Sequence, residues 1–258
     1  DYNSLYQESI DNPDKFWDSV AGRISWYKKW DKVSDVDFNK GNISWFENAK
    51  LNASYNCLDR HVESGSGDQI ALIWEGNNPE SHKTYTYKEL LIEVSKFSNV
   101  LKSHNIKKGD RVCLYMQMIP ELSIAMLACA RIGAVHSIVF GAFSPDSLAD
   151  RINDSKCKAL ITQDTGVRGL KQDIPMKSNA DKALEKCPSI EHCFVVQRTG
   201  AEVNMKNSRD IWWHEAMKTS LDLCKPEIMD AEDPLFILYT SGSTGTPKGV
   251  LHTTGGYM

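Results

Sequence analysis

Short apolar runs alternate with longer amphipathic segments through most of this 258-residue chain. The apolar runs are typical of buried strands and cover 111–116, 135–140, 158–162, 192–196 and 235–239. Helical patterns of about 10 to 12 residues lie between most of them, from Pro120 to Gly133, from Pro145 to Asp154 and near 179–186. Strands and helices that alternate in this way predict βαβ units. We therefore expect an α/β fold with a parallel sheet.

Three further elements are predicted around this alternating region. Thr86 and Glu89 form a capping box, which begins a helix. Its apolar face consists of Leu90, Leu91, Val94, Phe97 and Leu101. We expect a strand at 69–74 before this helix and another helix at 209–219, where Ile211, Trp212, Glu215 and Ala216 have helical spacing.

Composition limits the possible functions. The chain is 41% hydrophobic, which is enough for a core, and its net charge of −4 gives no support for nucleic-acid binding. No apolar run approaches the roughly 20 residues of a membrane span. The start, DYNSLYQESI, has no basic and apolar leader pattern, so no signal peptide is visible and a cytoplasmic protein is expected.

The seven cysteines are scattered, odd in number and without a C-x-x-C pair. This spacing argues against a disulfide framework and against a zinc site. Most of them are expected to be small buried hydrophobes. No metal-ligating residues are predicted in the chain.

Residues 1–62 are rich in aromatic side chains and lack regular sheet patterns. Pro13 follows Asn12, a good helix start, and we expect a mostly helical segment that packs on a larger body. Asp59, Arg60 and His61 at its end could suggest catalysis. A structural role is the better interpretation, because no nucleophile neighbours them.

A loop rich in glycine and hydroxyl side chains follows the strand at 235–239. It reads TSGSTGTPKG from Thr240 to Gly249. Glycines allow close approach of the backbone to a ligand, while hydroxyls, backbone N–H groups and Lys248 suit phosphate oxygens. The spacing is neither that of a Walker A motif nor that of a dinucleotide-binding fingerprint. The alternative is a flexible Ser/Gly surface loop, although such a linker seldom follows a hydrophobic strand directly.

TSGSTGTPKG closely resembles the phosphate loop of the adenylate-forming enzymes, which include acyl-CoA synthetases, luciferases and peptide-synthetase adenylation domains. The resemblance implies that Lys248 is catalytic, neutralising charge on the departing pyrophosphate together with Mg²⁺. It also implies a set of contacts to the ATP phosphates: Thr240, Ser241, Gly242, Ser243, Thr244, Gly245 and Lys248.

A second candidate site lies at 166–171, after the strand at 158–162. Two cations beside a glycine at the carboxyl end of a strand suit a phosphate, and a solvated basic turn is the alternative. The segment resembles the Arg-Gly-Gly-Arg patch that contacts CoA in acetyl-CoA synthetases, and 140–145 resembles their Phe-Gly-Gly-Phe-Ser-Pro. The implied CoA-binding residues are Ala142, Arg168, Gly169, Leu170 and Lys171. Ala142, Leu170 and Lys171 depart from the family pattern, which affects the expected affinity for CoA.

The string LNASYNCLDRH near 51–61 is similar to the end of the N-terminal extension of acetyl-CoA synthetases. The resemblance thus covers the whole chain and implies an extension at 1–62 and the first part of an AMP-binding domain at 63–258, without the C-terminal domain. The acyl pocket and Mg²⁺ ligands of that family lie in its later part.

The implied activity is an AMP-forming acetate–CoA ligase with acetate, ATP, Mg²⁺ and CoA, in which this chain alone is expected to be inactive. Three alternatives stay open at this point. They are a ligase for another short acid such as propionate, a naturally short protein that binds nucleotide or CoA without turnover, and a P-loop phosphohydrolase. The last would need a Walker B Asp, and no apolar strand ends in a plausible one.

Overall fold

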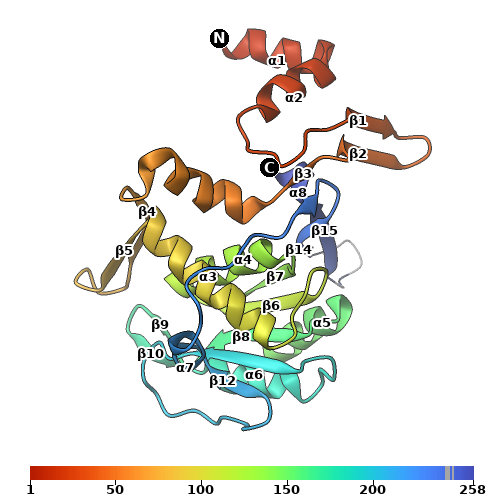
Figure 1. Cartoon of the computed structure of the whole chain (residues 1–258). Coiled ribbons are helices and arrows are strands. Elements are labelled where there is room, and N and C mark those ends of the chain that lie inside the picture. Colours follow the sequence, from red (N-terminus) through yellow and green to blue (C-terminus); the bar gives the residue numbers. More distant parts are fainter. Residues whose placement is uncertain (242–244, 246) are drawn as a thin grey trace.

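The computed structural model describes residues 1–241, 245 and 247–258, and a seven-stranded sheet forms its centre (Figure 1). The strand order is β12-β11-β8-β6-β7-β14-β15. All neighbours pair in parallel except β15, which is antiparallel to β14. The strands are β6 (Arg111–Met116), β7 (Val135–Phe140), β8 (Ala159–Gln163), β11 (His192–Val196), β12 (Asp210–Trp212), β14 (Pro234–Thr240) and β15 (Lys248–Thr253). The predicted α/β fold and all five predicted strands of the sheet are confirmed.

Helices cover both faces of this sheet, and the side chains of β6, β8 and β11 alternate between two apolar cores. One core contains α3 (Tyr87–Ser103), α4 (Pro120–Ile132) and α7 (Trp213–Lys218). The other contains α5 (Pro145–Ser155) and α6 (Met176–Leu184). In β6, Leu114 points into the first core and Tyr115 into the second. Burial on both faces explains why the strands are continuous apolar runs.

The chain changes direction across the sheet at β6. β7 pairs with one edge of β6 and β8 with the other, so the crossover from β7 to β8 passes over β6. The loops after β6 and β8 therefore diverge from each other. Open α/β sheets commonly bind ligands at such a point, outside the carboxyl ends of the strands.

Local capping chemistry sets the helix boundaries as expected. Thr86 Oγ1 accepts from the backbone N–H of Glu89 at 3.2 Å, and the Glu89 carboxylate accepts from the N–H of Thr86 at 2.8 Å. Gly133 ends α4 with φ of +72°, a left-handed conformation that favours glycine. Helix α6 begins at Met176, slightly earlier than predicted.

The N-terminal segment combines helices with a hairpin that the sequence did not predict. Its helices are α1 (Tyr2–Asp11) and α2 (Pro13–Ala21), followed by β1 (Lys32–Asp37) paired with β2 (Asn42–Glu47). Two π-helical segments, Tyr55–Asp59 and Val62–Ser66, lead to the rest of the chain. The hairpin was missed because its strands are mostly half-exposed and carry no clean apolar alternation.

Two other predictions need correction. The segment at 209–219 is not one helix, because Asp210–Trp212 instead pairs with β11 as an edge strand and only α7 is helical. The end of the predicted phosphate loop and the residues after it form β15, which was not predicted. The strand expected at 69–74 is present as β4 (Ile70–Glu75), in a hairpin with β5 (His82–Thr86). A second short pairing joins β3 (Lys50–Leu51) to β13 (Met229–Asp230).

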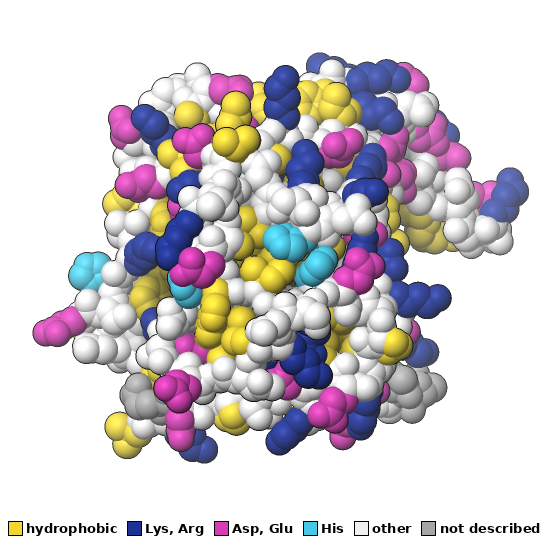
Figure 2. Space-filling model, turned by 60° about the horizontal axis from the view of Figure 1, so that its bottom comes forward, with side chains coloured by type: hydrophobic (Ala, Val, Ile, Leu, Met, Phe, Trp, Pro, Cys, Tyr) yellow, Lys and Arg dark blue, Asp and Glu magenta, His cyan; other side chains and the backbone are white. Residues whose placement is uncertain are grey.

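Surface charge is mixed on the face shown in Figure 2, where acidic and basic side chains are interspersed. None of the helices in the described ranges combines the length and apolarity needed to cross a bilayer.

Candidate functional site

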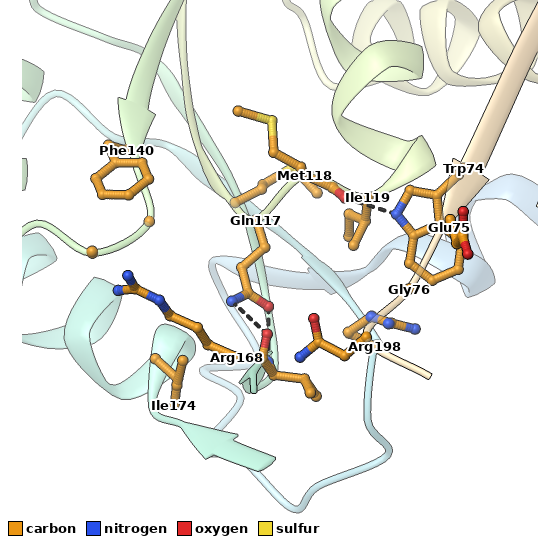
Figure 3. A pocket seen from close by; sticks show the side chains of 15 residues that line it. Trp74, Glu75, Gly76, Gln117, Met118, Ile119, Phe140, Arg168, Ile174 and Arg198 are labelled. Atoms are coloured by element: carbon orange, nitrogen blue, oxygen red, sulfur yellow. Dashed lines mark hydrogen bonds between the residues drawn. The ribbon is translucent and has the colours of Figure 1, made fainter. Parts of the chain in front are cut away.

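A pocket of about 400 Å³ opens at the carboxyl edge of the sheet, beside the point where the chain crosses β6 (Figure 3). Its walls come from the segments that follow β6, β7, β8 and β11, together with the end of β4. Two arginines, Arg168 and Arg198, and one acid, Glu75, are among the residues that line it. The lining is otherwise largely apolar or backbone. A pocket with a few convergent charged groups at this place in an α/β sheet is a candidate binding site.

Ala142 and Arg168, which the sequence analysis assigned to one site, both line this pocket. They come from different connections, since Ala142 follows β7 and Arg168 ends β9 (Gly166–Arg168). Gly141 beside Ala142 lies close to β6. A Cβ there would be 3.1 Å from the Met116 carbonyl oxygen, a tight contact that glycine avoids.

Arg168 is carried by a hairpin of β9 and β10 (Lys171–Ile174) with a two-residue turn, Gly169-Leu170. Gly169 has φ of +57°, whereas Leu170 is not in the left-handed region. A turn of this kind needs glycine only at its first central position, so leucine is tolerated at the second. The Leu170 side chain is fully exposed. Of the predicted CoA contacts, Gly169, Leu170 and Lys171 lie on this hairpin but do not line the pocket.

Gln117 anchors this hairpin to the sheet, a role that no sequence signal revealed. Its side-chain amide donates to the Val167 carbonyl at 3.1 Å and accepts from the Val167 N–H at 2.9 Å, as the dashed lines of Figure 3 show. A Cβ at Gly166 would lie 2.7 Å from the Gln117 side chain. A side chain at 166 would displace the Gln117 amide, which holds β9 against the end of β6.

Arg198 lines the pocket on a different wall from Arg168, and the sequence analysis missed it. It is the second residue after β11, at the carboxyl end of that strand. The same rule that drew attention to 166–171 would have found it.

The predicted phosphate loop begins where β14 ends and finishes where β15 begins. Thr240 and Lys248 face each other across this pair of strands, and both are exposed, as is Ser241. Gly245 has φ of +80°. The other predicted phosphate contacts, Gly242, Ser243 and Thr244, lie outside the described residues, as does Thr246. The loop and the pocket share one sheet edge, because β14 pairs in parallel with β7.

Arg151 on α5 packs between the two candidate sites. Its guanidinium carbon lies 4.4 Å from the ring centre of Phe143 and 5.4 Å from that of Tyr239. Phe143 follows Ala142 at the pocket, and Tyr239 precedes the phosphate loop. The Tyr239 hydroxyl donates to Asp154 at 2.6 Å, and burial together with this carboxylate raises the pKa of Tyr239 well above its usual range. Arg151 therefore ties the two segments to one helix.

No group of three His, Cys, Asp or Glu side chains that could hold a metal ion occurs within residues 1–241, 245 and 247–258.

Two family models together match almost the whole chain. The model for AMP-binding enzymes matches residues 58–258, and that for the acetyl-coenzyme A synthetase N-terminus matches residues 2–57. The chain is 58% identical to acetyl-coenzyme A synthetase of Magnetococcus marinus and 55% identical to acetyl-coenzyme A synthetase 2 of Pseudomonas putida. Both matches cover 100% of this chain and 40% of the relative.

The fold is that of a solved acyl-CoA synthetase. Acetoacetyl-CoA synthetase from Streptomyces lividans superposes with a TM-score of 0.88 at 24% identity, over 99% of this chain and 38% of that one. At this identity the likeness concerns the fold alone.

Proposed function

Because this chain belongs to the family of AMP-binding enzymes, we propose that it is the N-terminal part of an AMP-forming acetate–CoA ligase. The observation that carries the proposal is the match from end to end with proteins named acetyl-coenzyme A synthetase. The match of residues 2–57 to the model for the acetyl-coenzyme A synthetase N-terminus supports the same substrate class. The chain spans 40% of the length of these relatives, so the activity belongs to the longer protein.

The proposed reaction has two steps. A carboxylate oxygen of acetate attacks the α-phosphorus of ATP, and the bond to pyrophosphate breaks, which leaves acetyl-AMP. The CoA thiolate then attacks the acyl carbon, and AMP leaves with the bonding electrons. Acetate is already ionised at pH 7, so the first step needs no general base. It does need positive charge and hydrogen-bond donors, because an anion attacks a polyanion.

The segment between β14 and β15 supplies such groups. In the proposed roles, Thr240, Ser241, Ser243 and Thr244 donate hydroxyls, and Gly242 and Gly245 donate backbone N–H groups, to the β- and γ-phosphates. Lys248 neutralises charge on the departing pyrophosphate. Its place at the start of β15, opposite Thr240, supports this role, since the strand pair holds both ends of the loop together. ATP is taken to bind with Mg²⁺.

The pocket at the end of β6 is proposed to bind CoA for the second step. Ala142 and Arg168 contribute to its walls, and Gly169, Leu170 and Lys171 extend the same hairpin outward.

We assign residues 1–62 to the N-terminal extension and 63–258 to the first part of the AMP-binding domain. A cytoplasmic location is also proposed, and it is supported by seven cysteines that are all free thiols.

A ligase for a slightly longer acid such as propionate is the second candidate. The relatives are named for acetate, which favours acetate. A protein that binds nucleotide or CoA without turnover is the third, and it would form no acyl adenylate.

The test uses the full-length protein that contains this chain. Pyrophosphate exchange into ATP is measured without acid, with acetate and with propionate. We expect exchange that depends on acetate, and acetyl-CoA formation once CoA is added. Exchange at least as fast with propionate would contradict the acetate assignment, and no acid-dependent exchange would contradict a ligase altogether.

A further inference from the structure

Arg198 is held in the pocket by an aromatic ring. Its guanidinium carbon lies 4.8 Å from the centre of the Trp74 ring, at the end of β4 (Figure 3). Trp74 is fixed in turn, because its indole N–H donates to the Met118 carbonyl at 2.7 Å. A guanidinium that stacks on an indole keeps its planar fork of donors in one orientation. The Arg198 side chain is therefore oriented before any ligand arrives.

The backbone under Arg198 is held by a buried acid. Asp164, which is fully buried after β8, accepts hydrogen bonds through its carboxylate from three successive backbone N–H groups. The donors are Arg198 at 2.9 Å, Thr199 at 3.1 Å and Gly200 at 2.8 Å. A carboxylate buried with several donors fixes the loop that follows β11 relative to β8. Asp164 therefore holds the backbone of Arg198, while Trp74 holds its guanidinium.

The Arg198 side chain nevertheless has an unmet hydrogen bond. Its Nε is buried and has no hydrogen-bond partner among the described residues. Leaving a buried donor without an acceptor costs free energy, and this cost is greater when the donor belongs to a charged group. Glu75 also lines the pocket, yet no ion pair between Glu75 and Arg198 is formed in the part of the chain that the structure describes. Arg198 forms no ion pair with any described residue, so an anionic ligand in the pocket would supply its counter-charge.

We propose that Arg198 contacts a phosphate group of CoA, a different one from that contacted by Arg168, with Trp74 and Asp164 as its positioning residues. The proposal rests on the proposed function. Arg168 and Arg198 come from separate connections, after β8 and after β11, and both line one pocket. CoA carries two separated anionic groups, its diphosphate and its 3′-phosphate, which suits two arginines on different walls.

The test compares wild type, Arg198→Ala, Arg198→Lys and Trp74→Leu in the full-length protein. We expect Arg198→Ala to raise the KM and Kd for CoA roughly tenfold to a hundredfold, as loss of a charge-assisted contact does. Acetate-dependent pyrophosphate exchange should stay within about twofold of wild type, because CoA takes no part in that step. Arg198→Lys should recover only part of the affinity, since lysine lacks the planar fork. Trp74→Leu should weaken CoA binding in the same direction.

Dephospho-CoA identifies the group that is contacted. If Arg198→Ala weakens CoA but not dephospho-CoA, its partner is the 3′-phosphate, and if it weakens both equally, its partner is the diphosphate. The proposal requires the opposite response in Arg168→Ala, and the same response in both variants would overturn it. Lys182→Ala, at an exposed cation on α6, is the matched control and should change neither constant. Unchanged CoA affinity in Arg198→Ala, or equal losses in exchange and in CoA affinity, would overturn the proposal. Normal exchange by wild type in the same experiment would leave the proposed function standing.

Discussion

Arg131 on α4 donates two parallel hydrogen bonds to the carboxylate of Asp59, of 2.7 Å and 2.8 Å. The Arg131 side chain is 2% exposed and that of Asp59 13% exposed. The Arg131 Nε also donates to the Cys224 carbonyl at 2.6 Å. This ion pair joins the end of the N-terminal segment 1–62 to the helix layer of the sheet. The structural role expected for Asp59 is therefore confirmed.

Removing Asp59 should destabilise the protein strongly. Asp59→Ala leaves a buried guanidinium without its counter-charge, which costs about 3 to 5 kcal/mol. Asp146→Ala is the matched control, because Asp146 pairs with a largely exposed lysine, Lys186, at 2.7 Å. That change should cost far less, because an exposed ion pair contributes little to stability. Urea unfolding of the three proteins measures both values, and equal losses would refute a special role for the buried pair.

His136 should make the protein less stable in mild acid. It is buried on β7, its Nδ1 has no hydrogen-bond partner among the described residues, and burial lowers its pKa to about 4. In the unfolded chain the pKa of His136 is about 6.5. Between pH 6.5 and pH 4 the unfolded state therefore binds a proton at His136 that the folded state does not bind. Stability from this group is complete above pH 6.5 and is lost as the pH falls toward 4.

Between pH 7.5 and pH 5 the loss attributable to His136 should be about 2 kcal/mol. His136→Leu keeps an apolar side chain at this position and removes the titration. Unfolding free energies of both proteins at the two pH values isolate the effect, because all other groups are shared. A pH dependence identical in the two proteins would contradict the prediction.

Lys248→Ala should slow acetate-dependent pyrophosphate exchange in the full-length protein by roughly 10²-fold or more. Lys248 is the only cation between Thr240 and Gly249. Lys182→Ala serves as the control, because it also removes an exposed cation but lies on α6, outside the segment 240–249. Exchange within about threefold of wild type would rule out the assigned role of Lys248.

Arg168→Ala should raise the KM for CoA and leave pyrophosphate exchange almost unchanged. The reason is that CoA is absent from the first half-reaction. Initial rates of thioester formation at varied CoA, beside exchange rates, separate the two effects. Equal damage to both halves would mean that Arg168 only supports the hairpin, the basic-turn interpretation.

The sequence by itself determined five of the seven strands of the sheet, and the helices between β6 and β11, because burial on two faces and capping are local patterns. The runs at 111–116 and 192–196 are apolar because both faces are covered, and Thr86 with Glu89 marks a helix start wherever the helix packs. The motif at 240–249 identified the family for the same reason: its chemistry lies in consecutive residues.

Tertiary structure alone decided which of these segments meet. Hydrophobic periodicity indicates that a side chain is buried, but it does not identify the element against which that side chain packs. No local pattern therefore predicted that β7 and β8 would lie on opposite sides of β6. The pairing of Arg131 with Asp59 and the stacking of Arg198 on Trp74 join residues far apart in the chain. Their contacts exist only once long-range packing has brought the two segments together, and the pocket between Arg168 and Arg198 exists for that same reason.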